Sequence, residues 1–207
     1  MNRRVLWWTA GIAGLAAVIA LAVAFLGDGA GPTSTTTVAS EFGTVTVDGL
    51  ELPVLVDPAA DPAVGVSAPV LDGQGFDGSP MTIGPNGRPQ IVIFLAHWCP
   101  HCQREVPLLQ QWIDDTGGNP DVDLVSVATA SNQTSPNYPP SAWLEREGWT
   151  APVMADDRLG TAATAYGLPA FPYWVGLDSE GKVLFRFTGE LDEAGVEEVF
   201  AYVAENG

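Results

Sequence analysis

The sequence has few cysteines, few histidines and few basic residues. Its 207 residues include two cysteines, two histidines and eight Lys or Arg side chains against 25 Asp or Glu, for a formal net charge of −17. So acidic a surface repels phosphate backbones and anionic headgroups, and we therefore expect no nucleic-acid partner. Two cysteines allow at most one intrachain disulfide. With 46% apolar and 16% charged residues, the composition is that of a globular protein.

The N-terminus combines two arginines with a long apolar run. Residues 5–26 form an uncharged apolar run, and a helix of that length would be about 33 Å long, enough to cross a bilayer core. Arg3 and Arg4 precede the run and Asp28 follows it, so the positive-inside rule places the N-terminus in the cytoplasm. We expect residues 1–26 to be a single-pass anchor in the cell membrane, with an extracytoplasmic remainder. A cleaved signal peptide ending near "ALAVA" is the alternative, and it exports the same remainder.

Three further segments follow this N-terminal stretch. Residues 27–40 are small, polar and aperiodic, which is typical of a flexible linker. In residues 41–64, alternating side chains around Asp48 and Gly49 predict a hairpin, followed by a loop rich in proline and alanine. Residues 65–207 carry the patterns of a folded domain, and the sequence contains no internal repeat.

The domain alternates strand and helix patterns. A continuous apolar run at 91–95 predicts a strand buried on both faces, and 122–129 predicts a second. Between them, residues 100–116 carry a helical apolar face. The later elements are helices at 140–148 and 158–167, a short strand at 152–156, a hairpin turning at 179–181 and a helix at 192–206. This order predicts an α/β fold with a mixed sheet flanked by helices.

The chain's thiols and imidazoles fall within six consecutive positions, in "HWCPHC". Cys99 sits where the helix should begin, and Pro100 occupies the first helical position, where its missing N–H costs nothing. Unpaired N–H groups and the helix dipole favour a thiolate at Cys99, and a positive charge on His101 would favour it further. Thiolates are the nucleophiles of disulfide exchange. We therefore expect Cys99 to attack, and the more buried Cys102 to act as the resolving thiol.

Other interpretations of the cluster are possible. A structural disulfide between Cys99 and Cys102 would close so short a loop that it would remove little entropy from the unfolded chain. Zinc would need His97 and His101 as further ligands, but structural zinc sites join two separated pairs of ligands, and we expect no metal. His97 is interpreted as an incidental polar residue at the end of a strand.

The segment "VIFLAHWCPHC" resembles the active-site segment of the thioredoxin family, in which an apolar strand leads through W-C-x-x-C into a helix. Pro107 matches the proline that kinks the family's active-site helix. Pro172 matches the family's cis-proline, with Phe171 before it. The resemblance covers residues 65–205. It implies a thioredoxin-like fold, a half-exposed Trp98 beside the active site, and substrate binding at Phe171 and Pro172.

Two further segments resemble the membrane-anchored TlpA/ResA-like branch of this family. Residues 65–83 are similar to its N-terminal hairpin, and an insertion at 130–160 fits the same branch. "CQREVP" matches its C-x-x-E-x-P motif, which implies that Glu105 is its active-site glutamate. Ile93 stands where thioredoxin has a buried acid, so Glu105 is the candidate proton relay for Cys102. The alternative is an exposed glutamate favoured by the helix dipole.

The resemblance implies a thiol–disulfide oxidoreductase whose only redox group is the Cys99–Cys102 disulfide, with no cofactor. Its direction is open. The TlpA/ResA-like features favour a reductase of exported cysteine-containing proteins or apocytochrome c, recharged by a membrane electron-transfer partner. Pro100 and His101 resemble the centre of DsbA-like disulfide-forming oxidases, which would need an oxidase partner instead. A non-catalytic thioredoxin-like binding module is the alternative from another class.

Overall fold

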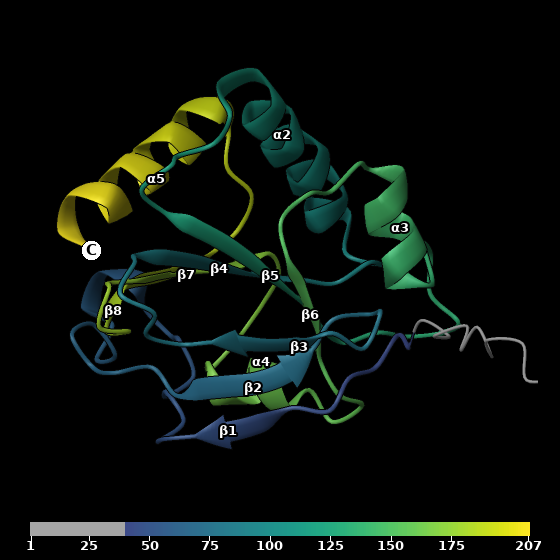
Figure 1. Cartoon of the computed structure of the whole chain (residues 1–207), viewed down its shortest axis with the longest axis horizontal. Helices are drawn as coiled ribbons and strands as arrows, with labels where there is room; N and C mark the ends of the chain where they lie inside the picture. The colour runs from purple at the N-terminus through teal and green to yellow at the C-terminus, as the bar shows by residue number, and fades with distance from the viewer. Residues whose placement is uncertain (1–39) are drawn as a thin grey trace, which may run out of the picture. The chain divides into compact units, whose positions relative to one another are not determined.

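Two β-sheets of unequal size carry the architecture (Figure 1). The computed structural model describes residues 40–207, so the expected anchor at 5–26 lies outside the described residues. Within residues 40–207, no helix combines the length and the apolar composition that crossing a lipid bilayer requires.

The larger sheet has five strands in the order β6-β5-β4-β7-β8. Its strands are β4 (Gln90–Leu95), β5 (Asp123–Ala128), β6 (Val153–Ala155), β7 (Tyr173–Leu177) and β8 (Val183–Thr188). β5 runs parallel to β4 and to β6, whereas β7 is antiparallel to both β4 and β8. The predicted mixed sheet is confirmed, and all six residues of its central strand β4 are buried.

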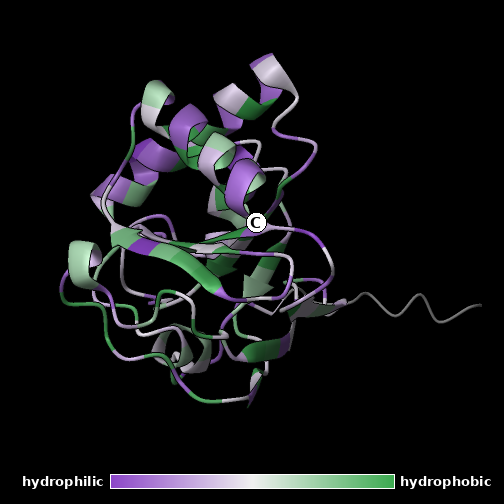
Figure 2. Cartoon of the chain, turned by 90° about the vertical axis from the view of Figure 1, so that its left-hand side faces the viewer, coloured by the Kyte–Doolittle hydropathy of each residue, from purple (hydrophilic) through white to green (hydrophobic). Residues whose placement is uncertain are grey.

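Two long helices cover one face of this sheet. The helices of the described chain are α2 (Pro100–Thr116), α3 (Pro140–Arg146), α4 (Thr161–Ala165) and α5 (Glu193–Asn206), with a short 3-10 helix, η1 (Pro58–Ala60). α2 and α5 lie together above the sheet (Figure 1), where the rings of Trp112 and Phe200 are 4.6 Å apart. Figure 2 shows hydrophilic residues on these helices, while much of the sheet below is hydrophobic. Such a distribution is typical of amphipathic helices, which turn their apolar face toward a hydrophobic core.

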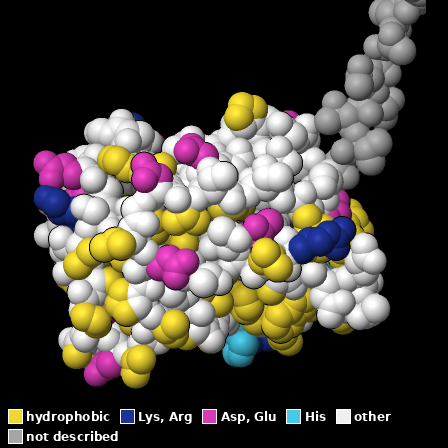
Figure 3. All heavy atoms as spheres, turned by 90° about the horizontal axis from the view of Figure 1, so that it is seen from below, with side chains coloured by type: hydrophobic (Ala, Val, Ile, Leu, Met, Phe, Trp, Pro, Cys, Tyr) yellow, Lys and Arg dark blue, Asp and Glu magenta, His cyan; other side chains and the backbone are white. Residues whose placement is uncertain are grey.

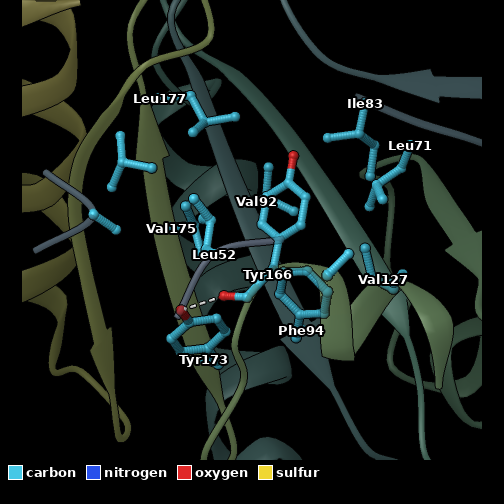
Figure 4. Close-up of a cluster of buried hydrophobic side chains, with 14 of the residues drawn as sticks. Leu52, Leu71, Ile83, Val92, Phe94, Val127, Tyr166, Tyr173, Val175 and Leu177 are labelled. Atoms are coloured by element: carbon cyan, nitrogen blue, oxygen red, sulfur yellow. Dashed lines mark hydrogen bonds between the residues drawn. The ribbon is translucent and has the colours of Figure 1, made fainter. Parts of the chain in front are cut away.

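The smaller sheet covers the opposite face together with α4 (Figure 1). Its strands are β1 (Thr46–Asp48), β2 (Val70–Gln74) and β3 (Pro80–Ile83), and β2 pairs with both neighbours. Apolar side chains from the two sheets and α4 form one core, in which the Tyr173 hydroxyl donates to the carbonyl oxygen of Tyr166 at 2.9 Å (Figure 4). The β2–β3 pair is the hairpin expected within residues 65–83.

The hairpin predicted around Asp48 and Gly49 is wrong. β1 pairs with β2, across about twenty intervening residues. The chain after Gly49 instead buries Leu52 and Leu55, whose N–H groups donate to the carbonyl oxygens of Ala165 and Gly167 at 2.9 and 3.0 Å. The segment therefore lies against α4 and the residues after it. The two buried leucines are three residues apart, whereas buried side chains on one face of a strand recur every second residue. Residues 41–64 therefore belong to the same core as the domain that follows.

A buried ion pair ties this segment to β8. Both side chains of the Arg186–Asp61 pair are fully buried, and the Arg186 Nε donates to Asp61 at 2.7 Å. Arg186 also donates to the carbonyl oxygens of Pro53 and Tyr166. The bonds from Arg186 hold the pKa of Asp61 below its usual value. The pair thereby satisfies charges and backbone groups that burial would otherwise leave costly.

Candidate active site

The cysteine motif lies at the junction between β4 and α2. Cys99 occupies the position before the first helical residue, with φ −76° and ψ 120°, and Pro100 is the first residue of α2. The Cys99 N–H donates to the carbonyl oxygen of Ala96 at 3.0 Å. The predicted placement of Cys99 at the start of the helix is confirmed, so this residue lies at the positive end of the helix dipole.

The two sulfurs have different surroundings. Cys99 is 6% exposed, and its Sγ lies 3.8 Å from the carbonyl oxygen of Phe171. Cys102 is fully buried, and its Sγ accepts from the N–H of Ala96 at 3.5 Å. Burial raises the pKa of Cys102 far above its usual value, and the charge of Glu105 contributes a smaller rise. Cys102 is therefore the more buried thiol of the pair, as the sequence predicts, and this burial favours its protonated form.

Glu105 lies one helical turn beyond Cys102 and is 1% exposed. Its Oε2 accepts from the N–H of Leu191 at 2.8 Å, while its Oε1 has no hydrogen-bond partner among the described residues. Burial raises the pKa of Glu105 to about 7, against a smaller lowering by the Leu191 bond. The interpretation of Glu105 as an exposed surface acid is therefore wrong. A buried carboxyl that titrates near neutral pH is suited to exchanging protons with a thiol.

His101 points into a charged surface cluster. Arg104 Nη2 lies 2.9 Å from His101 Nδ1, and Glu190 Oε1 lies 3.4 Å from the same nitrogen. A guanidinium only donates, so the Arg104 contact requires an unprotonated Nδ1, whereas the Glu190 contact requires a protonated one. The two contacts compete for one ring nitrogen. The tuning of Cys99 by His101 stays a prediction.

An aromatic pair, Trp98 and Phe171, lies beside Cys99. The Phe171–Pro172 peptide bond is cis, as expected from the resemblance. Trp98 is half-buried, its ring meets that of Phe171 edge-on with centroids 5.7 Å apart, and its Nε1 donates to the carbonyl oxygen of Ala130 at 2.8 Å. This places an apolar surface directly beside the sulfur of Cys99.

A groove continues from this aromatic pair. It encloses a cavity of about 330 Å³ with both apolar and polar walls. Its lining includes Phe42, Ala130, Ser131, Arg158, Leu168 and Phe171. The Arg158 guanidinium stacks 3.9 Å from the centre of the Phe42 ring. Because Phe171 contacts Cys99 and also lines the groove, a substrate cysteine at Cys99 would direct its neighbouring residues into it.

His97 has a structural role that its position did not reveal. It is 1% exposed, its Nδ1 donates to the carbonyl oxygen of Pro136 at 2.7 Å, and its Nε2 accepts from the N–H of Asn132 at 3.0 Å. Burial lowers the pKa of His97 below its usual value, which favours this neutral ring. His97 thus holds the loop after β5, and this role uses both of its ring nitrogens.

The sequence analysis did not identify three residues that contact the candidate site residues His101 and Glu105: Arg104, Glu190 and Leu191. Arg104 lies 86 residues from Glu190, as Glu105 does from Leu191, and no spacing rule relates such distant positions.

Within residues 40–207, no three His, Cys, Asp or Glu side chains gather into a group that could hold a metal ion.

The fold and the junction define a thioredoxin-fold protein with a Cys-Pro-His-Cys centre. The chain belongs to the Redoxin family, whose model matches residues 63–201, about two thirds of its length. The resemblance drawn from the sequence is thereby confirmed for the fold and the family.

Individual relatives agree with this assignment. The chain is 30% identical over 132 residues to the methylamine utilization protein MauD of Methylophilus methylotrophus, a match covering 60% of this chain and 56% of MauD. It is 27% identical over 109 residues to the thiol-disulfide oxidoreductase ResA of Halalkalibacterium halodurans, covering 51% and 58%. The matches thus span just over half of each relative. The crystal structure of StoA from Bacillus subtilis has the same fold, with a TM-score of 0.54 and 22% identity over 68% of this chain and 98% of StoA.

Proposed function

We propose that this protein is a thiol–disulfide oxidoreductase that reduces disulfides in other proteins through Cys99 and Cys102. The observation that carries the proposal is the pairing of a sulfur at a helix N-terminus with a buried thiol and a buried carboxyl one turn further on. The Redoxin family membership and the similarity to ResA, a thiol-disulfide oxidoreductase by name, support it.

The reaction begins at Cys99. Its thiolate attacks one sulfur of the substrate disulfide, forming a Cys99–substrate bond while the second substrate sulfur leaves as a thiolate and takes a proton from solvent. The helix N-terminus stabilises the attacking anion. The Phe171 carbonyl, 3.8 Å from Cys99 Sγ, fixes the side from which an extended substrate approaches, and the neighbouring groove takes its side chains.

Cys102 completes the reaction. Its thiol passes a proton to the Glu105 carboxylate, and the resulting thiolate attacks Cys99 Sγ. The substrate leaves as its second thiolate, which is protonated from solvent, and a Cys99–Cys102 disulfide remains. The substrate has then gained two electrons and the protein has lost two. Burial keeps Cys102 protonated until this step, so a nearby base is required, and Glu105 titrates in the suitable range.

The reducing direction is proposed because the features that resemble the TlpA/ResA-like branch, Glu105 among them, extend over more of the chain than the dipeptide between the cysteines does. The opposite direction, disulfide formation by a DsbA-like oxidase, is favoured by Pro100 and His101 between the cysteines. A thiolate stabilised at Cys99 would make the disulfide a stronger oxidant. The two directions differ in reduction potential, which decides between them.

Location and partners are part of the same proposal. The apolar run at 5–26 with Arg3 and Arg4 before it supports a membrane anchor and an extracytoplasmic catalytic domain. Substrates would then be exported cysteine-containing proteins, apocytochrome c among them, and a membrane electron-transfer partner would reduce the Cys99–Cys102 disulfide again. The net charge of −17 supports the absence of nucleic acid among the partners.

Trapping of the mixed disulfide tests the proposal. In Cys102→Ser the first attack can occur but resolution cannot, so the variant should accumulate disulfide-linked adducts with a disulfide-containing substrate such as insulin, visible on a non-reducing gel. Cys99→Ser should form none and should lose insulin reduction.

The matched control is the double variant Cys99→Ser/Cys102→Ser, which separates exchange from simple binding. Equal insulin reduction by Cys99→Ser and by the unsubstituted protein would refute the role of Cys99. Association with substrate that survives in the double variant, without adducts in Cys102→Ser, would identify a non-catalytic binding module instead.

A further inference from the structure

The loop between β8 and α5 reaches α2 at two adjacent points. On the surface, Glu190 pairs with Arg104, and beneath it the N–H of Leu191 donates to Glu105 Oε2 at 2.8 Å. Arg104 and Glu105 are consecutive on the helix, and Glu190 and Leu191 are consecutive on the loop. The inner hydrogen bond and the outer ion pair therefore depend on one placement of the loop.

Two hydrogen bonds between Arg104 and Glu190 hold the loop in that placement. Arg104 Nε donates to Glu190 Oε2 at 2.8 Å, and Arg104 Nη2 to Glu190 Oε1 at 3.0 Å. Such a two-point contact has a defined geometry that a single ion contact lacks. Because both side chains are more than a third exposed, the pair contributes little to global stability. Its effect is local, on the position of the loop.

A cavity of about 590 Å³ lies at this contact, with Glu105 in its lining. The other lining residues are Arg104, Leu108, Glu190, Leu191 and Asp192. Although it borders this cavity, Glu105 is only 1% exposed, and its Oε1 has no partner among the described residues. A small outward shift of the loop would remove the Leu191 bond and expose to water a carboxyl that is now buried.

We propose that Arg104 and Glu190 are positioning residues for the resolving step: their ion pair closes the loop over Glu105 and keeps that carboxyl dehydrated one helical turn from Cys102. This inference rests on the proposed function, in which Glu105 accepts the proton of Cys102. The charged and titratable groups around Glu105 are Cys102 and Arg104 on α2, and Glu190 and Asp192 on the loop.

The pair also reaches the cysteine motif. Arg104 Nη2, which binds Glu190, lies 2.9 Å from His101 Nδ1. One guanidinium thus joins the dipeptide between the cysteines to the loop over the proton acceptor. Loss of the pair therefore affects both ends of the site, whereas a surface ion pair elsewhere on the chain would affect neither.

The test is the titration of Glu105 in the full-length protein, followed by its carboxyl infrared band, which Glu105→Gln identifies by removing it. Three variants weaken the pair: Glu190→Gln removes a charge, while Glu190→Asp and Arg104→Lys keep both charges but lose the two-point geometry. A hydrated Glu105 ionises more easily, so its midpoint should fall by about one pH unit in all three. The pH profile of resolution of a preformed mixed disulfide should move with it.

Asp123→Asn is the matched control, because it breaks a surface ion pair of the same length, Arg88–Asp123 at 2.8 Å, at the start of β5. It should leave the midpoint unchanged. A shift in Glu190→Gln alone would mean that charge and not position matters, and would overturn the proposal, as would no shift in any variant. If the unsubstituted protein shows no disulfide exchange while the three midpoints fall, the proposed function fails and the positioning of Glu105 stands.

Discussion

At the scale of single residues, burial separates the roles of two chemically identical side chains. Cys99 lies at the N-terminus of α2, against the Phe171 carbonyl, and Cys102 lies one turn inside the helix with no exposed surface. The same helix then buries Glu105 beneath the surface pair of Arg104 and Glu190. An attacking sulfur, a protonated resolving thiol and a proton acceptor thus follow from three positions on one helix.

Replacing Glu105 by glutamine should slow the resolving step. The carboxylate accepts the Cys102 proton only when ionised, so the rate in the unsubstituted protein should rise through a pH of about 7, the pKa of Glu105. Glu105→Gln should abolish this rise and lower the rate above it by about 10²-fold, a typical effect of losing a general base. The measurement is single-turnover resolution of a mixed disulfide between pH 5 and 9. An unchanged profile would contradict the role of Glu105.

The same substitution should make the fold more stable at alkaline pH. The pKa of Glu105 is raised from its ordinary value of 4.5 to about 7. Between these values the folded state holds a proton that the unfolded state has lost. This contribution to the free energy of unfolding is therefore complete below the lower pKa, decreases as pH rises toward the upper pKa, and is lost above it. This loss amounts to about 3 kcal/mol. Urea unfolding of Glu105→Gln at pH 5 and 8 should lack it, and an equal pH dependence in both proteins would contradict the burial of this charge.

At the scale of elements, the sequence predicted the position of those helices, strands and turns whose ends are set by neighbouring residues. The helix expected at 100–116 has those bounds in the structure because Pro100 starts it and Gly117, with φ 79°, ends it. The buried strand at 91–95 is β4, one residue longer. The turn at 179–181 joins β7 and β8 as predicted. In each case the residues that set the boundary are next to it in the sequence.

Contacts between distant segments could not be predicted in this way. The turn residues Asp48 and Gly49 suggested a local hairpin, but β1 pairs with β2, and Leu52 and Leu55 lie in the core formed with α4. The burial of Glu105 was only one of two alternatives, since it depends on Leu191. Tertiary packing decided both outcomes.

The loop after β5 offers a prediction at this scale. His97→Phe removes the donor to the Pro136 carbonyl and the acceptor of the Asn132 N–H, which should lower the free energy of unfolding by about 2–3 kcal/mol. Burial lowers the pKa of His97, so the unfolded state takes up a proton that the folded state refuses, and stability falls as pH drops below the ordinary value of 6.5.

Urea unfolding at pH 5 and 7.5 checks this expectation. The acid-dependent part of the loss should be smaller in His97→Phe than in the unsubstituted protein. His101→Gln is the matched control: it replaces the other histidine of the sequence at a side chain that is 56% exposed, and it should not cause the loss of about 2–3 kcal/mol expected for His97→Phe. Identical pH dependence in His97→Phe would contradict a buried, neutral His97.

At the scale of the whole molecule, two cores share the central sheet. One packs between the sheet and the helices α2 and α5, and the other between the sheet, α4 and the three-stranded sheet. On the face seen from below, acidic side chains stand apart from one another with hydrophobic ones grouped between them (Figure 3). The redox site belongs to the first core, whereas the second carries the buried pair of Arg186 and Asp61.

This pair should matter for the whole fold. Arg186→Met leaves Asp61 buried without its partner and removes donors from the Pro53 and Tyr166 carbonyl oxygens. Such a loss typically costs about 3–5 kcal/mol, of which an apolar double replacement, Asp61→Leu/Arg186→Met, should recover a part. Urea unfolding measures both. Arg88→Met, at the exposed pair with Asp123, is the matched control and should cost less than about 1 kcal/mol; an equally small loss in Arg186→Met would contradict the role of the buried pair.

The reduction potential of the Cys99–Cys102 couple tests the proposed direction most directly. The full-length protein would be equilibrated with thiol and disulfide buffers, and tryptophan fluorescence would follow the couple, since Trp98 adjoins Cys99. A protein that reduces disulfides should show a two-electron couple near that of thioredoxin, about −270 mV. A value near about −120 mV, as in strong disulfide-forming oxidants, would contradict the reductase and assign Pro100 and His101 the deciding role.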